Sequence, residues 1–185
     1  MRKITTALMT VFTLMLVSAG VLAQDSASLA KQVQEHTDRV DINAMLVQYT
    51  TGLDRVDPDL YAGAFTADAK FYQGESPESA VIMAEGTAQI RKIITDLRDS
   101  DAASQARREA EWEGEGSPPV RIRHHVMTNA TVDLIDDHTA MHKSYWMTVS
   151  GAGRDMNVVA QGSYQDTLVK ENGKWLIKER YLLRR

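Results

Sequence analysis

The chain has 185 residues, a formal net charge of −4 and no cysteine. Without cysteine, disulfides, thiolate metal sites and cysteine nucleophiles are all excluded. An acidic balance argues against nucleic acid and anionic membranes as partners, because both carry negative charge.

The first 23 residues have the pattern of a cleavable secretory signal peptide. Arg2 and Lys3 precede a mainly apolar run from Ile4 to Leu22, and cleavage is expected after Ala23. An uncleaved membrane anchor is the alternative, but the run is short for a spanning helix. Cleavage would leave 162 residues with a formal charge of −6, which suits one domain. We therefore expect a secreted or periplasmic protein with no membrane contact after cleavage.

Helical periodicity marks the first part of the mature chain. Residues 24–37 form a polar lead-in, and apolar residues at helical spacing predict an amphipathic helix over residues 38–55. Asp57 is suited to cap a second helix, and Pro58 suits its first position.

Two short strands and a third helix are expected next. The strands are predicted over residues 68–73 and 80–84, and the helix begins near Gly86. Residues 99–119 are charged and polar and end in glycine and proline. They predict a partly helical insertion with a flexible end, of the kind that often forms a lid.

The rest of the chain consists of long strand patterns separated by turns, including Asn172-Gly173, a strong hairpin signal. The predicted strands cover residues 120–135, 139–149, 156–170 and 174–183. Helices followed by sequential hairpins predict one α+β domain over residues 38–185. We expect a cone-shaped α+β barrel, in which the N-terminal helices pack on a strongly curved, mainly antiparallel sheet and enclose a pocket.

The strand predicted over residues 120–135 carries the adjacent histidines His124 and His125. Imidazole is the side chain best suited to proton transfer near neutral pH. Strict alternation places His124 on an apolar face, where it would serve packing, and His125 on a more polar face with Asn129. A β-bulge would change this division. Because adjacent side chains point to opposite faces, the two imidazoles cannot easily share a metal ion, and no metal site is predicted.

Several segments, in their order and spacing, resemble the SnoaL-like family of the nuclear transport factor 2-like superfamily. The matching segments are the helix 42–55 with Asp57-Pro58-Asp59-Leu60, Phe65-Thr66-Ala67-Asp68-Ala69, His125-Val126-Met127-Thr128-Asn129, Gly162-Ser163-Tyr164-Gln165-Asp166 and Gly173-Lys174-Trp175. The resemblance implies an α+β cone with a pocket between helices and bent sheet, usually in a homodimer or homotrimer.

The resemblance also implies an Asp–His dyad, as in scytalone dehydratase and hexachlorocyclohexane dehydrochlorinase of that superfamily. The matching positions are Asp54 and His125. This chain departs from the two enzymes elsewhere. Tyr49 stands where the dehydrochlorinase has lysine, and Leu53 stands where scytalone dehydratase has tyrosine. The substrate is therefore left unassigned.

A carboxylate that binds one imidazole nitrogen raises the basicity of the other, which suits dehydration, elimination or isomerisation without a cofactor. We expect an exported enzyme in which Asp54 orients His125 as general base or acid, acting on a small hydrophobic or cyclic molecule. Its substrate-binding side chains are expected to be Tyr49, Tyr61, Phe65, Asn129, His142, Trp146 and Tyr164.

Two other hypotheses remain open. The same cavity could bind a small apolar ligand without turning it over, or the domain could serve oligomeric assembly with a vestigial pocket. Aromatic residues at these spacings more often form plain core, and the alternative role of Asp54 is only to cap or solvate the end of the helix. A hydrogen bond between Asp54 and His125 inside an enclosed cavity favours the enzyme, whereas a pocket filled by its own side chains favours assembly.

Overall fold

The computed structural model describes residues 2–118, 120, 122–152 and 154–184, and for residues 2–25 it describes the helical backbone alone. The predicted signal peptide lies outside the described side chains, so its cleavage stays a prediction. Contacts divide the chain into two units, Met1–Val40 and Asp41–Arg185. The first unit is part of one long helix, α1, which runs over Arg2–Asp54 and enters the second unit. Among the described residues, no helix is both long and apolar enough to cross a membrane.

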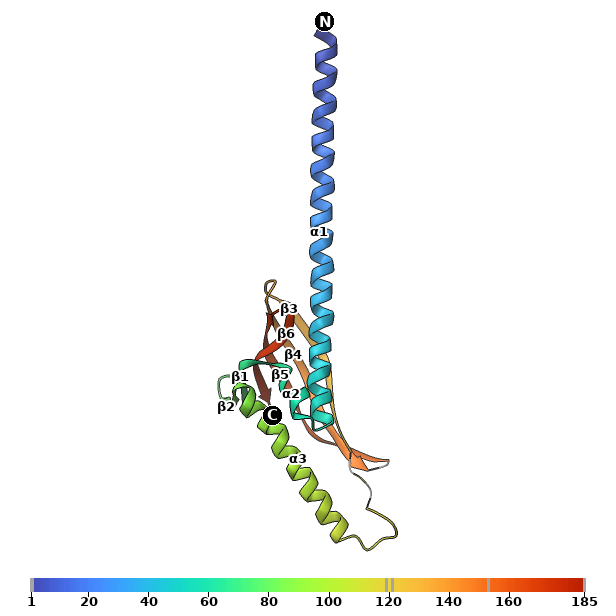
Figure 1. Ribbon diagram of the computed structural model, residues 1–185, viewed down its shortest axis with the longest axis vertical. Coiled ribbons are helices and arrows are strands. Elements are labelled where there is room, and N and C mark those ends of the chain that lie inside the picture. The colour runs from blue at the N-terminus through green and yellow to red at the C-terminus, as the bar shows by residue number, and fades with distance from the viewer. Residues whose placement is uncertain (1, 119, 121, 153, 185) are drawn as a thin grey trace. The chain divides into compact units, whose positions relative to one another are not determined.

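The second unit has the predicted α+β architecture (Figure 1). Its elements after α1 are α2 (Pro58–Ala62), β1 (Phe65–Gly74), β2 (Val81–Glu85), α3 (Gly86–Ala110), β3 (Ile122–Leu134), β4 (Thr139–Ala152), β5 (Asp155–Glu171) and β6 (Lys174–Leu183). The fold class is confirmed, and β6 has the predicted bounds. The strands form a curved sheet that does not close, in the order β2-β1-β6-β5-β4-β3.

Strand pairing leaves β3 at one edge of the sheet. β1 and β6 are parallel, while the other neighbouring pairs are antiparallel. An edge strand has one row of backbone N–H and C=O groups without a strand partner. Residues of β3 can therefore offer backbone hydrogen bonds to other parts of the chain.

The turn between α1 and α2 determines where the end of α1 lies. The Asp57 carboxylate accepts hydrogen bonds from the backbone N–H groups of Asp59 and Leu60, both at 3.0 Å, so it caps α2 as predicted. Gly52 lies so close to α2 that a Cβ there would sit 2.5 Å from the backbone nitrogen of Tyr61. The two helices thus meet backbone to backbone, two residues before Asp54.

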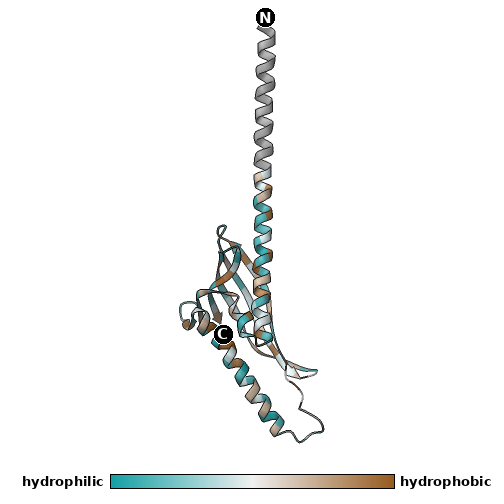
Figure 2. Ribbon diagram, in the orientation of Figure 1, coloured by the Kyte–Doolittle hydropathy of each residue, from teal (hydrophilic) through white to brown (hydrophobic). Residues whose placement is uncertain are grey.

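Aromatic side chains form the centre of the core between the helices and the sheet. Tyr49 from α1 contacts Tyr61 and Phe65, with ring centroids 4.9 and 5.9 Å apart. Trp146 of β4 stacks on Tyr164 of β5 at 5.8 Å. Buried and less buried residues alternate along much of β4, the second half of β5 and β6, and Figure 2 shows both hydrophobic and hydrophilic residues in the sheet. The concave side of the sheet is thus filled largely by the protein's own side chains.

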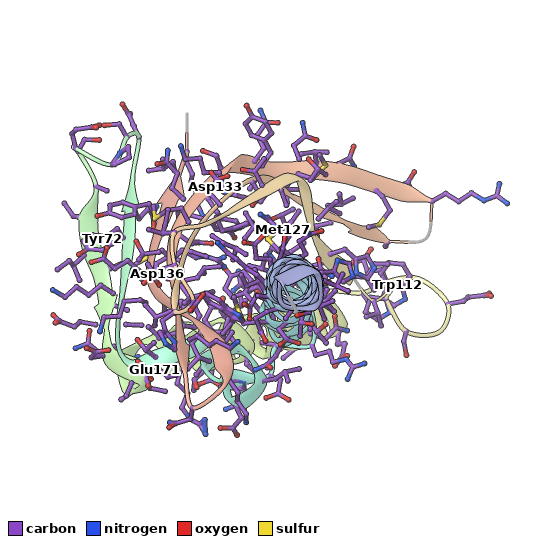
Figure 3. The ribbon with its side chains drawn as sticks, turned by 90° about the horizontal axis from the view of Figure 1, so that it is seen from above. Tyr72, Trp112, Met127, Asp133, Asp136 and Glu171 are labelled. Carbon is purple, nitrogen blue, oxygen red and sulfur yellow. The ribbon has the colours of Figure 1, made fainter. Side chains whose placement is uncertain are left out.

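Helix α3 is longer than the sequence predicted. It continues to Ala110, so residues 99–110 extend the helix as regular structure, and the connecting loop begins after it. Alanine, arginine, glutamine and glutamate in this stretch all favour helix, although few of them are apolar. Trp112 is 41% exposed and lies on the loop after α3, away from the core (Figure 3).

A β-bulge divides β3 into two halves. Odd-numbered side chains point toward the core before the bulge, and even-numbered ones do so after it. The register with β4 shifts between Thr128 and Thr131, and Asn129 has a φ of 53° in the left-handed region. Before the bulge Met127 packs against the core, and after it Val132 does so. The predicted grouping of Asn129 with the face of His125 is therefore wrong, because the extra residue reverses the alternation and Asn129 is exposed.

Candidate functional site

Asp54 and His125 lie in direct contact, as the resemblance implied. The Oδ1 atom of Asp54 is 2.7 Å from Nδ1 of His125 and also accepts the backbone N–H of His125 at 2.8 Å. Two donors from one residue hold one oxygen in place. Because Nδ1 carries the hydrogen that faces the carboxylate, Nε2 is the nitrogen left with a lone pair.

The edge position of β3 explains this contact. The backbone N–H of His125 has no strand partner on the outer side, so the carboxylate at the end of α1 can take it. Gly52 brings the end of α1 close to α2, and the helix then stops at Asp54. The contact thus depends on a helix end and a sheet edge that are 71 residues apart.

Burial of the His125 imidazole lowers its pKa below the ordinary value, although the hydrogen bond and charge of Asp54 oppose that shift. The side chain is 13% exposed, and that of Asp54 is 25% exposed. Removing an imidazolium from water is unfavourable, which is why burial favours the neutral form. At neutral pH His125 is therefore a neutral imidazole with a carboxylate behind it.

His124 also lies beside Asp54, contrary to the prediction that it serves packing. Its side chain is 58% exposed, and its Nδ1 is 3.5 Å from Oδ2 of Asp54. The two neighbouring imidazoles do leave the strand on opposite faces. They nevertheless reach one carboxylate, because that carboxylate lies at the strand edge between the two faces.

A pocket of about 850 Å³ opens beside this carboxylate, between α3 and the start of β3. Asp54, His124 and Arg123 line it from one side, and Asp101 and Arg108 of α3 line it from the other. Arg123 donates two hydrogen bonds to Asp101, at 3.0 and 3.1 Å, which joins β3 to the extended part of α3. The helix extension therefore supplies one wall of the pocket.

A second Asp–His pair is fully buried in the core. Oδ2 of Asp166 is 2.6 Å from Nδ1 of His142, and Arg180 donates to both oxygens of Asp166, at 2.8 and 2.6 Å. Burial alone would raise the pKa of Asp166, yet Arg180 and His142 keep it below the ordinary value. The Arg180 guanidinium also lies over the rings of Tyr49 and Tyr164, at 4.0 and 4.2 Å. This network joins α1 to three strands.

Sequence reasoning missed Asp166 and Arg180. The signal was present in the alternation of β5, because Asp166 falls between the inward positions Tyr164 and Leu168. Arg180 likewise lies on the same face of β6 as the buried Leu182. Charged residues at inward strand positions indicate a buried ion pair, since a single buried charge is unfavourable.

The predicted substrate-binding residues separate into two groups in the structure. Tyr49, Tyr61, Phe65 and His142 lie in the buried core. Asn129, Trp146 and Tyr164 contribute to another pocket, of about 590 Å³, along β4 and β5. None of the seven lines the pocket beside Asp54. Their role in substrate binding stays a prediction. Within the described residues, no group of three or more His, Asp or Glu side chains is arranged to hold a metal ion.

The lowered pKa of His125 predicts a pH-dependent stability. An unfolded histidine titrates near pH 6.5, so between that pH and the lower folded pKa the unfolded state binds more protons. The contribution of His125 to stability is therefore present above about pH 6.5 and is lost as the pH falls through this window. The free energy of unfolding, measured with urea, is expected to decline less between about pH 8 and about pH 5 for His125→Gln than for the wild type. His138→Gln, in an exposed turn, is the matched control. Equal declines for the wild type and His125→Gln would contradict the burial of a neutral imidazole.

The geometry defines an α+β fold with a carboxylate–imidazole pair at the open edge of its curved sheet. A model of the SnoaL-like domain matches residues 34–181. The chain therefore belongs to the SnoaL-like domain family.

Solved structures with a similar fold include one that is named as an enzyme. A proposed scytalone dehydratase from Novosphingobium aromaticivorans is 20% identical with a TM-score of 0.59, over 83% of this chain and 88% of its own. An NTF2-like protein with a cystatin-like fold from the same organism is 15% identical with a TM-score of 0.64, over 84% and 87%. ActVI-ORFA from Streptomyces coelicolor is 18% identical with a TM-score of 0.58, over 79% and 96%. At these identities the similarity shows the fold alone. No curated protein matched the sequence.

Proposed function

We propose that this protein is a cofactor-independent acid–base enzyme of the dehydratase, isomerase or eliminating type, with Asp54 and His125 as its dyad. The observation that carries the proposal is the 2.7 Å contact between Oδ1 of Asp54 and Nδ1 of His125. The similarity to a proposed scytalone dehydratase supports the same reaction class. The substrate class is a small hydrophobic or cyclic molecule that carries a carbonyl group.

The chemistry follows from the state of the imidazole. With Nδ1–H donating to Asp54, the lone pair of Nε2 can accept a proton from carbon next to a carbonyl group. Burial keeps His125 neutral near pH 7, so the base is available without prior deprotonation. Asp54 then stabilises the imidazolium that forms. A positioned general base of this kind contributes about 10²–10⁴-fold to the rate.

Proton abstraction can be tested separately from the rest of the reaction. We would incubate the protein with 3-hydroxycyclohexanone in D₂O and follow exchange of the hydrogens next to the carbonyl by NMR. His125→Gln and Asp54→Asn are expected to slow exchange by about 10²–10⁴-fold, because they remove the base or its partner. His138→Gln changes an exposed turn and is the control. Exchange by the wild type no faster than in buffer, or exchange unchanged in His125→Gln, would overturn the proposal.

One observation favours the assembly hypothesis as a second function. Side chains of the protein fill the concave side of the sheet, while apolar residues on the other side are exposed, among them Ile122, Val126, Tyr145 and Val158. We propose a homodimer or homotrimer that buries this outer face. Light scattering on the purified protein and on Val126→Asp tests it, and a monomeric wild type would contradict it.

Export remains part of the proposed function. It is supported by the charged start and apolar run of residues 1–23. The intact mass of protein recovered outside the cytoplasm would show whether the chain begins at Gln24.

A further inference from the structure

We propose that Arg180 is a positioning residue for the dyad of Asp54 and His125, because it fixes the way in which the end of α1 is turned against the sheet. For its effect on the reaction rate, the inference rests on the proposed function. It assigns a task in that function to the buried network of Asp166, His142 and Arg180, whose members are not part of the dyad.

Arg180 contacts α1 through the ring of Tyr49. The central carbon of its guanidinium lies 4.0 Å from the centroid of that ring and 4.2 Å from the centroid of the Tyr164 ring. A guanidinium over an aromatic face is attracted to it, and more strongly where water is excluded. The hydroxyl groups of Tyr49 and Tyr164 also lie 3.2 Å apart, within hydrogen-bonding distance. The Tyr49 side chain is thus held to the sheet at both its ring and its hydroxyl group.

The guanidinium of Arg180 is itself held in one orientation. It donates to both oxygens of Asp166, at 2.8 and 2.6 Å, and Nδ1 of His142 lies 2.6 Å from one of these oxygens. All three side chains are at most 1% exposed. A planar fork on a carboxylate fixes direction as well as distance. Apolar side chains could fill this space without removing two charges from water. The ion pair adds a fixed direction for the guanidinium, and so for the Tyr49 ring.

The position of Asp54 depends on how α1 is turned, because Tyr49 precedes it by five residues on the same helix. Side-chain atoms lie about 5–6 Å from a helix axis, so turning α1 by about 10° moves the Asp54 carboxylate by about 1 Å. Oδ1 of Asp54 accepts from His125 at 2.7 and 2.8 Å, and lengthening such hydrogen bonds by about 1 Å breaks them. A catalytic group displaced by about 1 Å can lose about 10²-fold in rate.

The network also refers both halves of the dyad to the same strand. His125 lies on β3, which pairs only with β4, and its partner there is Thr148. His142 of β4 belongs to the network that holds Tyr49. The place of His125 and the rotation of α1 are therefore both set from β4, and Asp54 meets His125 when the two agree.

The test uses the full-length protein with Arg180→Lys, which keeps the charge beside Asp166 but lacks the planar fork. The hydrogen on Nδ1 of His125 is observed by NMR and assigned by its loss in His125→Gln. A short hydrogen bond to a carboxylate moves such a signal far downfield. In Arg180→Lys this downfield signal is expected to be lost. Hydrogen exchange of 3-hydroxycyclohexanone is expected to show a kcat about 100-fold lower with little change in KM, since the dyad and not binding is altered.

A second pair of variants tests the route through α1, and serves if Arg180→Lys does not fold. Tyr49→Leu removes the ring over which the guanidinium lies, whereas Tyr49→Phe keeps the ring and removes only the hydroxyl group. Tyr49→Leu is expected to lose the downfield signal and exchange as Arg180→Lys does. Tyr49→Phe is expected to recover most of both. Ile177→Ala is the control for a general loss of core stability, because Ile177 is fully buried on β6 but is not in the network. Circular dichroism identifies a temperature at which each variant is folded.

The outcomes separate this inference from the proposed function. A wild-type signal and wild-type exchange in folded Arg180→Lys and Tyr49→Leu would overturn the positioning role and leave the dyad's function intact. Losses in Ile177→Ala equal to those in Arg180→Lys would also overturn it, because any weakening of the core would then suffice. A wild type that shows the downfield signal without exchange contradicts the proposed function. Loss of that signal in Arg180→Lys would still support the control of the Asp54–His125 contact by Arg180.

Discussion

Asp166→Ala is expected to destabilise the protein by about 3–5 kcal/mol, because it leaves the Arg180 guanidinium buried without a counter-charge. Arg180 and Asp166 are both almost completely inaccessible, and Asp166 accepts from Arg180 through both oxygens. The substitution also removes the partner of His142 Nδ1. Guanidinium chloride unfolding, followed by circular dichroism, measures the loss. If Asp166→Ala does not fold, Asp166→Asn keeps the volume and one acceptor, and is expected to fall between the wild type and Asp166→Ala.

The control for this prediction is an exposed ion pair. Asp68 contacts Lys178 on the surface, and the carboxylate side chain is 70% exposed. Exposed pairs contribute little, because water solvates both charges well when they separate. Asp68→Ala is therefore expected to change stability only slightly. If Asp166→Ala lowers the free energy of unfolding no more than Asp68→Ala does, the buried network does not stabilise the fold.

Gly162→Val is expected to lower stability by about 1–3 kcal/mol or more, because overpacking in a core forces its neighbours to move. Even a Cβ at this position would lie 2.1 Å from the carbonyl oxygen of Leu183 and 3.0 Å from the Trp146 ring. The oxygen belongs to β6, which pairs with β5 at Ser163 and Leu183 and so cannot easily withdraw. Thermal unfolding measures the effect.

Ser163→Val is the neighbouring control, because Ser163 is only partly buried and pairs with the exposed Tyr145. It introduces the same β-branched side chain into the same strand, one residue away. A melting temperature of Gly162→Val equal to that of Ser163→Val would contradict the close approach between β5, Trp146 and the end of β6.

The elements of the fold were largely predictable because local patterns specify them. Turn residues marked the ends of the strands, and β6 has the predicted bounds, Lys174–Leu183. Asp57 capped α2 through two backbone N–H groups, as its position before Pro58 indicated. The juxtaposition of Asp54 and His125 came from a family resemblance. No local pattern could have brought together two residues 71 positions apart.

The wrong predictions fall where non-local contacts decide the outcome. Alternation along β3 could not locate the bulge at Asn129, since the bulge is a mismatch between β3 and β4. Alternation also placed His124 away from Asp54, because it describes faces and takes no account of a carboxylate at the strand edge. The helical part of residues 99–119 was predicted without its bounds, and it continues α3 to Ala110 through local helix propensity.

By itself, the sequence determined the α+β class, the order of its elements and two of the residues that meet at the site. These depend on hydrophobic period, turn chemistry and capping, which act between residues close in the chain. Only the tertiary structure decided that Asp54 would face both His125 and His124, and that α3 would form a wall of the pocket beside Asp54. It also decided that Asp166, His142 and Arg180 would share one buried network. Those outcomes depend on where a helix end meets a sheet edge, and on which inward side chains meet across strands.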